Sequence, residues 1–400
     1  MDNIIEIINL TKLFEWGPAV PQYFFFTGIS AAAFLVSSLA IVFGDRRFRP
    51  IAGLALILAF TMLLAAPLNL VADLAQPGRF YELFYRLHLT SPMSWGVFLL
   101  IAYGLLMLAE SLFVFRSGFA RRAQFAARPV PASFYRFLAL GDPQVTASTE
   151  ARDQRLARLL GAAAIPFAIG IEIYTGFLLF FALGRPLWSS PLLPAIFLVS
   201  GLVSGLALLV LLGWWLVRQH GRPFWTVLNG LGVMLGWTIL VDLALRVAWH
   251  GLAYITNPVA YLPVLQFLFQ EHFVESVVLE AGLGLLLPAA VMLVGPLRRL
   301  RPLFLTAAFL AFVGVWLFRW TTVIGGQEIP KILAGYYAYQ PALMGGKGVM
   351  EIVANWSLWV FLFILFTWFT PWRPAELERS APPAETVPAV QAGKLTGGAS

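Results

Sequence analysis

Two chemically active side chains, Glu172 and Tyr174, lie within an apolar stretch at residues 159–183 that is long enough to cross a lipid bilayer. Burying a carboxyl group or a phenol in hydrocarbon costs free energy, so such residues mark candidate functional sites. Two steps along a helix amount to a rotation of about 200°. The two side chains therefore face nearly opposite directions and cannot both point at one ligand.

The elements that must position these residues are membrane helices. The 400-residue chain is 60% hydrophobic and 12% charged, which is outside the range of soluble domains. We predict an all-α fold: a polytopic transmembrane bundle over residues 1–372, arranged as two four-helix bundles plus one additional helix. The nine predicted spans are residues 20–43, 51–75, 93–115, 159–183, 192–216, 227–252, 274–294, 303–320 and 350–370.

The basic residues predict the orientation of these spans. If the N-terminus lies outside, every connection on the inner side carries arginine, beginning with Arg46, Arg47 and Arg49. The positive-inside rule therefore predicts N-out and C-in, in a multi-pass protein of the cell inner membrane. We expect residues 116–158 to form a basic cytoplasmic loop. Residues 373–400, rich in Pro, Ala and Gly, are expected to form a disordered cytoplasmic tail.

With this orientation, the buried polar residues gather in the outer half of the bilayer. Glu172 is thirteen residues from the inner start of its span, which is about 20 Å along the helix. The others in this leaflet are Asn69, Asp73, Asp242, Arg246, Glu275, Glu280 and Arg319. Polar residues with purely structural roles should be distributed over both halves of the bilayer. Their concentration in the outer half therefore predicts a polar pocket that opens outward.

Some of these residues have a purely structural interpretation as well. Asp242 and Arg246 are four residues apart and either neutralise each other or belong to a site. Asn69 and Asp73 either cap a helix end or contact a ligand.

Glu172 and Glu280 have no obvious partner in sequence, so each pairs with an arginine from another helix or is held protonated. We expect both to be functional, as proton-relay groups or buried ion-pair partners. Glu110 falls toward the inner side, and we expect it to reach the interface by snorkelling rather than to begin a proton path.

Several classes of site are excluded or disfavoured. The chain has no cysteine, which rules out disulfides and thiolate-held iron–sulfur clusters within it. His220 lies in an inner connection, whereas His88, His250 and His272 lie in outer connections or helix ends, so two stacked bis-histidine haems are not available. We predict no haem and no metal site. The net charge of +7 resides between the spans, which indicates membrane topology rather than nucleic-acid binding.

Several short motifs occur together in a characteristic order. They are Asp73-Leu74-Ala75-Gln76-Pro77-Gly78-Arg79-Phe80, Ser91-Pro92-Met93-Ser94-Trp95-Gly96, Tyr174-Thr175-Gly176, Arg185-Pro186-Leu187-Trp188, Pro191-Leu192-Leu193-Pro194, and Arg319 with Gly325-Gly326-Gln327. Each alone is weak, but the set resembles the NrfD/PsrC family of membrane subunits from polysulfide-reductase-type molybdenum enzymes, over nearly the whole chain.

The resemblance implies a haem-free membrane anchor that binds menaquinone or ubiquinone near the periplasmic face. Its partners would be an iron–sulfur subunit and a molybdopterin catalytic subunit. Tyr174 matches the family tyrosine that contacts the quinone carbonyl, and Gln22 or Tyr23 occupies the second polar position, where some members have histidine.

A quinone needs an apolar slot, hydrogen-bond donors for its carbonyl groups and a route for protons. We expect Gln22, Tyr23, Asn69, Asp73, Tyr174 and Arg185 to bind it. Glu172, Glu280 and His272 are the proton-relay candidates.

Two other functions remain open. A proton-coupled secondary transporter also carries acids inside the membrane, but it would predict inverted repeats, and no convincing repeat is present. A structural anchor without quinone chemistry is the second alternative. The terminal substrate, whether polysulfide, tetrathionate, arsenate or sulfite, is not specified by these residues.

Overall fold

The computed structural model describes residues 16–74, 76–86, 88, 90–124, 131–142, 144–182, 184–217, 222–329, 335–344 and 348–373. Within these ranges the protein is helical almost throughout, and nine helices are long and apolar enough to cross a membrane. The predictions of an all-α fold and nine spans are confirmed. The predicted tail, residues 373–400, lies outside the described residues apart from Arg373.

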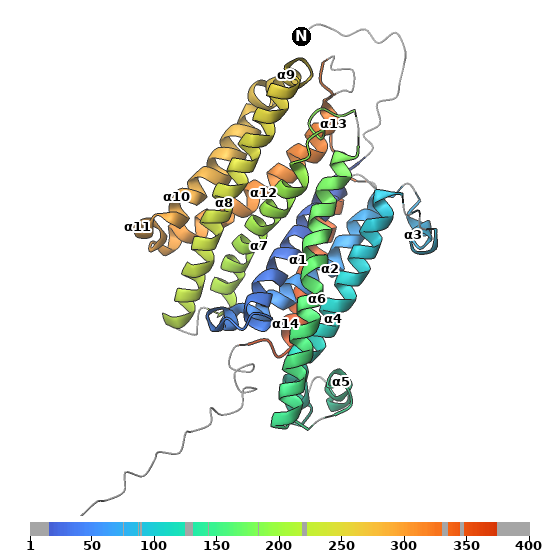
Figure 1. The fold of residues 1–400 in the computed structure, drawn as a ribbon, viewed down its shortest axis with the longest axis vertical. Coiled ribbons are helices and arrows are strands. Elements are labelled where there is room, and N and C mark those ends of the chain that lie inside the picture. The colour runs from blue at the N-terminus through green and yellow to red at the C-terminus, as the bar shows by residue number, and fades with distance from the viewer. Residues whose placement is uncertain are drawn as a thin grey trace, which may run out of the picture.

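The first four long helices form one side of the molecule (Figure 1). They are α1 (Ala19–Ile41), α2 (Arg49–Asp73), α4 (Pro92–Gln124) and α6 (Ala147–Phe180). The other side consists of α7 (Leu193–Val217), α8 (Arg222–Thr256), η5 (Val274–Leu286) with its continuation α10 (Leu287–Leu293), and α12 (Arg301–Trp320). The ninth span, α14 (Val349–Phe369), packs against α2.

The two groups of helices meet along α1 and α7. Helix α1 packs on α2 and α6 in its own group and on α7 across the boundary. Helix α7 packs in turn on α6, α8 and α12. Consistent with this central position, nearly every residue of α1 is buried. The junction of α1, α6, α7 and α12 is therefore the interior of the whole molecule.

Short elements connect the spans at two opposite ends. One end, called here the α13 end, carries η2 (Pro77–Arg79), α3 (Glu82–Tyr85), α9 (Pro258–Gln266), η4 (Phe267–Glu271), η6 (Thr321–Gly325) and α13 (Gly326–Glu328). The other, called here the α5 end, carries η1 (Arg46–Phe48), α5 (Ala132–Leu138) and α11 (Gly295–Arg298).

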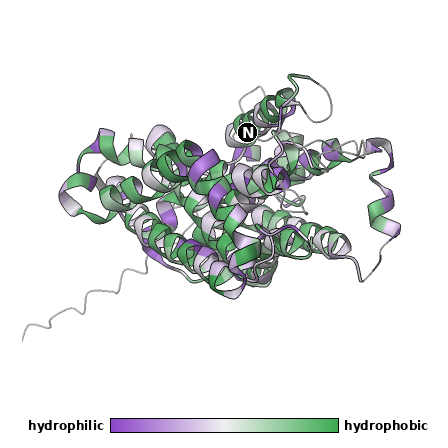
Figure 2. Ribbon diagram, turned by 90° about the horizontal axis from the view of Figure 1, so that it is seen from above, coloured by the Kyte–Doolittle hydropathy of each residue, from purple (hydrophilic) through white to green (hydrophobic). Residues whose placement is uncertain are grey.

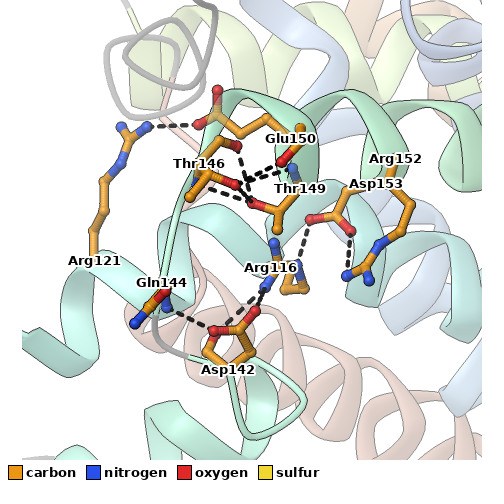
Figure 3. Close-up of polar contacts among 10 residues, drawn as sticks. Arg116, Arg121, Asp142, Gln144, Thr146, Thr149, Glu150, Arg152 and Asp153 are labelled. Carbon is orange, nitrogen blue, oxygen red and sulfur yellow. Dashed lines mark hydrogen bonds and ion pairs between the residues drawn. The ribbon is translucent and has the colours of Figure 1, made fainter.

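At the α5 end, α4 and α6 continue well past the predicted spans 93–115 and 159–183. Buried Arg116 on α4 pairs with Asp153 on α6, and Arg121 Nη2 lies 3.0 Å from Glu150 Oε1 (Figure 3). These ion pairs join the two extensions, so much of the stretch predicted as a loop at residues 116–158 is helical. A search for about 20 consecutive apolar residues finds the part of a helix that crosses the hydrocarbon. It misses helical turns that continue beyond the membrane.

The outer surface of the bundle is apolar. Seen from above, the helices are coloured largely green, which marks hydrophobic residues (Figure 2). Large side chains such as Trp215, Val247 and Ile255 are strongly exposed on α7 and α8. Such a surface requires a lipid surrounding, as expected of an integral membrane protein.

The predicted span 274–294 is not a regular α-helix. Its first thirteen residues, η5, are π-helical, and the α-helical turns of α10 follow. Gly284 in η5 lies against Gly314 in α12 so closely that a Cβ atom on Gly284 would be 2.6 Å from the Gly314 Cα. Backbone approach of this kind is how membrane helices pack without large side chains between them.

Substituting Gly284 by alanine is expected to destabilise the protein by about 1–3 kcal/mol, because the added methyl group overlaps the α12 backbone. Gly230→Ala on α8 is the matched control, since a Cβ atom there meets nothing within 4 Å. The control should be neutral or slightly stabilising. Thermal unfolding of both variants in detergent measures the difference, and equal midpoints would contradict the packing.

Candidate functional site

A cavity of about 740 Å³ lies near the α13 end, between α1, α2, α4 and α6. Three of the residues predicted to bind a ligand line it: Tyr23 on α1, Asp73 at the end of α2 and Tyr174 on α6. Most of the remaining wall is apolar, including Phe24, Leu100 and Leu178, which are typical of a slot for a ring or chain. We refer to it as the first cavity.

The Tyr174 side chain occupies space that a side chain at position 96 of α4 would fill. A Cβ atom on Gly96 would lie 2.3 Å from the Tyr174 hydroxyl oxygen and equally close to its ring. Only glycine at position 96 lets the phenol approach the α4 backbone this closely. Its hydroxyl group makes no hydrogen bond with any described residue, so its donor is available to a ligand.

Asp73 and Trp16 line the first cavity at the α13 end. One Asp73 carboxylate oxygen accepts a hydrogen bond from the Gly17 backbone N–H at 2.8 Å. The Trp16 backbone exchanges two hydrogen bonds with the Gln327 side chain, at 3.0 and 3.1 Å. The entry to α1 is thus tied both to the end of α2 and to α13.

Two other predicted ligand contacts face away from this cavity, toward α14. Gln22 donates to the Ile352 carbonyl oxygen at 3.3 Å, and Asn69 accepts from the Asn355 amide at 2.7 Å. Asn69 also donates back to the carbonyl oxygens of Ala65 and Ala66 within α2. Neither side chain lines the first cavity, and Asn69 acts within α2 and toward α14 rather than capping the helix with Asp73.

Glu172 is the centre of a buried ion pair that joins the two groups of helices. Its Oε1 lies 2.5 Å from Arg319 Nη2 on α12, and the Thr27 hydroxyl on α1 donates to its Oε2 at 3.2 Å. Both Glu172 and Arg319 are essentially inaccessible to solvent. Of the two interpretations for Glu172, the pairing with an arginine from another helix is therefore the one found.

Glycines make room for this ion pair. A Cβ atom on Gly28 of α1 or on Gly201 of α7 would lie 3.0 Å from Glu172 Oε1. Arg319 also donates to the Phe197 carbonyl oxygen at 2.9 Å and lies 3.9 Å from the centre of the Phe197 ring. The charges are thus enclosed by backbone and by an aromatic face rather than by water.

A second group of charges lies between α8 and η5. Arg246 donates to Asp242 at 2.9 Å and to Glu280 at 2.5 Å, and its guanidinium carbon lies 3.7 Å from the centre of the Phe318 ring. Asp242 and Arg246 do neutralise each other, but Glu280 joins them as a third member. Glu280 therefore does not lie in the first cavity with Tyr174.

The last two predicted residues lie in the connections of the α13 end. Arg185 donates to the carbonyl oxygens of Gly326 and Gln327, both at 3.3 Å, and covers the Trp188 ring at 5.0 Å. His272 Nε2 is 3.6 Å from Glu328 Oε2. Neither lines the first cavity. The predicted residues are therefore divided among five places: the first cavity, the contacts with α14, the ion pair with Arg319, the charge group between α8 and η5, and the connections of the α13 end.

Glu110 differs from the other buried acids. It is completely buried in α4, and neither of its carboxyl oxygens has a hydrogen-bond partner among the described residues. A Cβ atom on Gly161 of α6 would lie 2.6 Å from its Oε1. The expectation that it snorkels to the interface is wrong, because the side chain faces α6 rather than the lipid surface.

Comparison with known proteins identifies the family. A family model described as "Polysulphide reductase, NrfD" matches residues 6–331. The chain belongs to this family. It is a membrane subunit of the type found in reductase complexes, and it is a multi-pass integral membrane protein.

Several relatives of this NrfD-family protein are components of reductases. It is 32% identical over 335 residues to the C subunit of selenate reductase from Mesobacillus selenatarsenatis, a match that covers 82% of this chain and 77% of that protein. It is 27% identical over 365 residues to the C subunit of tetrathionate reductase from Salmonella typhimurium, covering 90% and 94%. The C chain of polysulfide reductase from Wolinella succinogenes is 32% identical over 213 residues, covering 52% and 60%. The resemblance inferred from the short motifs is confirmed.

Arg319→Met is expected to destabilise the protein by about 3–5 kcal/mol, because it leaves the Glu172 carboxylate buried without its counter-charge. Glu172→Met combined with Arg319→Met should recover most of that loss. Thermal unfolding of the single and double variants in detergent measures the coupling between them. Arg79→Met, which removes an exposed pair with Glu82, is the control and should change little. Additive effects of the two buried changes would disprove the coupling.

Glu110→Met is expected to stabilise the fold by about 1–3 kcal/mol, because it replaces a buried carboxyl group that has no partner among the described residues with an apolar side chain of similar length. The unfolding temperature in detergent should rise. Glu150→Met, which breaks the ion pair with Arg121 at the same end, should lower it. A fall with Glu110→Met would show that this carboxyl group is stabilised in the folded protein.

Proposed function

We propose that this protein is the quinone-reactive membrane subunit of a molybdopterin-dependent respiratory oxidoreductase. In this proposal the first cavity binds quinone or quinol, and electrons pass between that molecule and an iron–sulfur subunit. The observation that carries the proposal is the first cavity itself: a mostly apolar space of about 740 Å³ that contains two phenols and a carboxylate. Membership of the NrfD family supports the membrane-anchor part of the role.

The composition of the first cavity suits the chemistry of a quinone. The ring and tail require apolar walls, and the carbonyl oxygens require donors that carry no permanent charge in a low-dielectric site. Tyr174 supplies a donor with no other partner in the described residues, and Tyr23 supplies a second phenol on the opposite helix. Asp73 adds a proton acceptor at the α13 end. We assign these three residues to the substrate.

Proton movement must accompany the two-electron reaction, since two protons enter or leave with each quinone reduced or quinol oxidised. We propose that Glu172 serves this step, because the Thr27 hydroxyl lies 3.2 Å from Glu172 Oε2 and 3.1 Å from the Tyr23 carbonyl oxygen and so connects the two residues. Glu280 and His272 lie farther along the α13 end, near Arg246 and Glu328 respectively. They are proposed as later groups on the route to solvent.

We further propose that the α13 end faces the periplasm and receives the iron–sulfur partner. Support comes from the basic side chains at the opposite end, including Arg116, Arg121 and Arg152, which the positive-inside rule would place in the cytoplasm (Figure 3). Trp16 and Asp73 line the first cavity at the α13 end, so a cluster carried by a partner docked there would approach it closely.

Tyr174→Phe is expected to lower kcat/KM for quinol-linked turnover of the assembled complex by about tenfold, the cost of one lost hydrogen bond to the substrate. Turnover with an artificial dye that donates electrons to the partner subunits should be unchanged. Tyr135→Phe is the matched control, since this buried phenol packs against Phe119 at the α5 end.

Extraction of the purified complex separates this function from that of a structural anchor. Quinone should be recovered with the wild-type complex and identified by mass spectrometry. If the Tyr174→Phe variant has the turnover rate of the wild type, Tyr174 does not contact the substrate. A complex that holds no quinone and shows no quinol-linked turnover would support the anchor instead.

A further inference from the structure

A second cavity, of about 470 Å³, lies on the other side of the molecule among α8, η5, η6 and α12. Its wall includes Trp249 and His250 from α8, Ser276 and Glu280 from η5, and Phe318 from α12. It shares no lining residue with the first cavity. Most of its surface is apolar. The second cavity is therefore a separate space, and Glu280 is the one lining residue that the proposed reaction in the first cavity also uses.

Three polar atoms on residues that line the second cavity have no hydrogen-bond partner among the described residues. One is Nη2 of Arg246, which lies 2.7 Å from Asp242 Oδ2 in their ion pair, and the two uncharged ones are Nε1 of Trp249 and Oγ of Ser276. Trp249 is only 2% exposed, and its ring stacks on His250 with 4.4 Å between ring centres. Buried indole N–H groups are normally hydrogen-bonded, because leaving them without an acceptor costs free energy. The two uncharged atoms are themselves buried, so each donates to an acceptor inside the cavity after a rotation of its side chain.

The π-helical winding of η5 shapes this wall. The η5 residues that line the second cavity are Ser276, Val277, Glu280, Ala281 and Leu285. Ser276 and Glu280 are four residues apart, and Glu280 and Leu285 are five apart. These steps are close to one turn of a helix wound more loosely than an α-helix, so the three residues lie on one face. This π-helix extends over thirteen residues, whereas most π-helices are single turns inside an α-helix. Such turns are frequent at functional sites. A long π-helix beside donors without partners points to a ligand.

The charged residues beside the second cavity favour binding of an uncharged ligand. Arg246 is bonded to both Asp242 and Glu280, so its positive charge is already matched by two carboxyl groups. A phosphate or carboxylate head group would meet these acids and is disfavoured. A head group with carbonyl oxygens would accept from Trp249 and Ser276 without adding charge.

The outer part of the second cavity suits a hydrocarbon tail. Val247, Tyr254 and Phe269 line it and are at the same time exposed on the apolar surface, at 72%, 44% and 53%. A tail leaving past these residues would enter the surrounding lipid. The required ligand is thus lipid-soluble and neutral, with hydrogen-bond-accepting oxygens at one end.

We propose that the second cavity is a second binding site for a quinone-class molecule, with its carbonyl oxygens at Trp249 and Ser276. The two cavities are neighbours: Trp16 of the first stacks on Trp188 at 5.2 Å, and Trp188 donates to the carbonyl oxygen of Thr322 in the second at 2.6 Å. The ligand class follows from the donors and charges of the second cavity alone. The site is therefore independent of whether the first cavity binds quinone.

The test uses the assembled complex in lipid nanodiscs and a photoreactive azido-naphthoquinone, with cross-linked peptides identified by mass spectrometry. The wild-type complex should be labelled both near Tyr174 and within residues 243–285. Ala281→Phe, which fills the second cavity, should reduce the second label about tenfold and leave the first unchanged. Ala244→Phe, on α8 outside the cavity, should leave both labels unchanged.

A second variant covers the case in which Ala281→Phe does not fold. Trp249→Phe removes the indole donor together with part of the ring, and labelling of residues 243–285 should then require an about tenfold higher quinone concentration. Three results would overturn the site: no wild-type label in this segment, a label that neither variant lowers, or a phospholipid retained there in an electron density map. Loss of the label near Tyr174 alone would count against the first cavity and leave the second site standing.

Discussion

The arrangement of this protein depends on one buried ion pair, between Glu172 on α6 and Arg319 on α12. Burying two charges inside a membrane protein costs free energy, and close contact between them together with further hydrogen bonds offsets much of that cost. The helices that carry them belong to different groups, so the pair fixes how the groups meet. Gly28 and Gly201 leave the space that it needs, and the face of Phe197 covers the guanidinium group. The junction of α1, α6, α7 and α12 follows from these requirements.

The ion pair also separates two chemical environments. On the side of α4, Tyr174 faces a mostly apolar cavity, and its hydroxyl group has no partner among the described residues. On the side of α8, Arg246 gathers two acids around a second apolar cavity. Because the protein has no cysteine to hold an iron–sulfur cluster, these two spaces are where small molecules could bring redox chemistry into the membrane. In the proposed function, the two cavities are the sites that bind small molecules.

Much of this could be predicted from the sequence, because hydrocarbon thickness and helical rise together determine where spans begin and at what depth each residue lies. Depth placed Asp73 at one end, the family resemblance added Tyr23 and Tyr174, and the three do share a cavity. Depth says nothing about rotation between helices. Gln22 and Asn69 therefore turned out to face α14, Glu110 to face α6, and Glu172 to meet Arg319, a residue 147 positions away.

Other features lie beyond what apolar periodicity can reveal. The helical turns of residues 147–158 are charged and are stabilised by ion pairs with α4, so no hydropathy window includes them. The indole of Trp188 lines neither cavity, but it stacks on Trp16 of the first and donates to the carbonyl oxygen of Thr322 in the second. A ligand that displaces Trp16 would shift this ring against its contact with Thr322. Occupancy of one cavity is consequently felt at the wall of the other, although no side chain lines both.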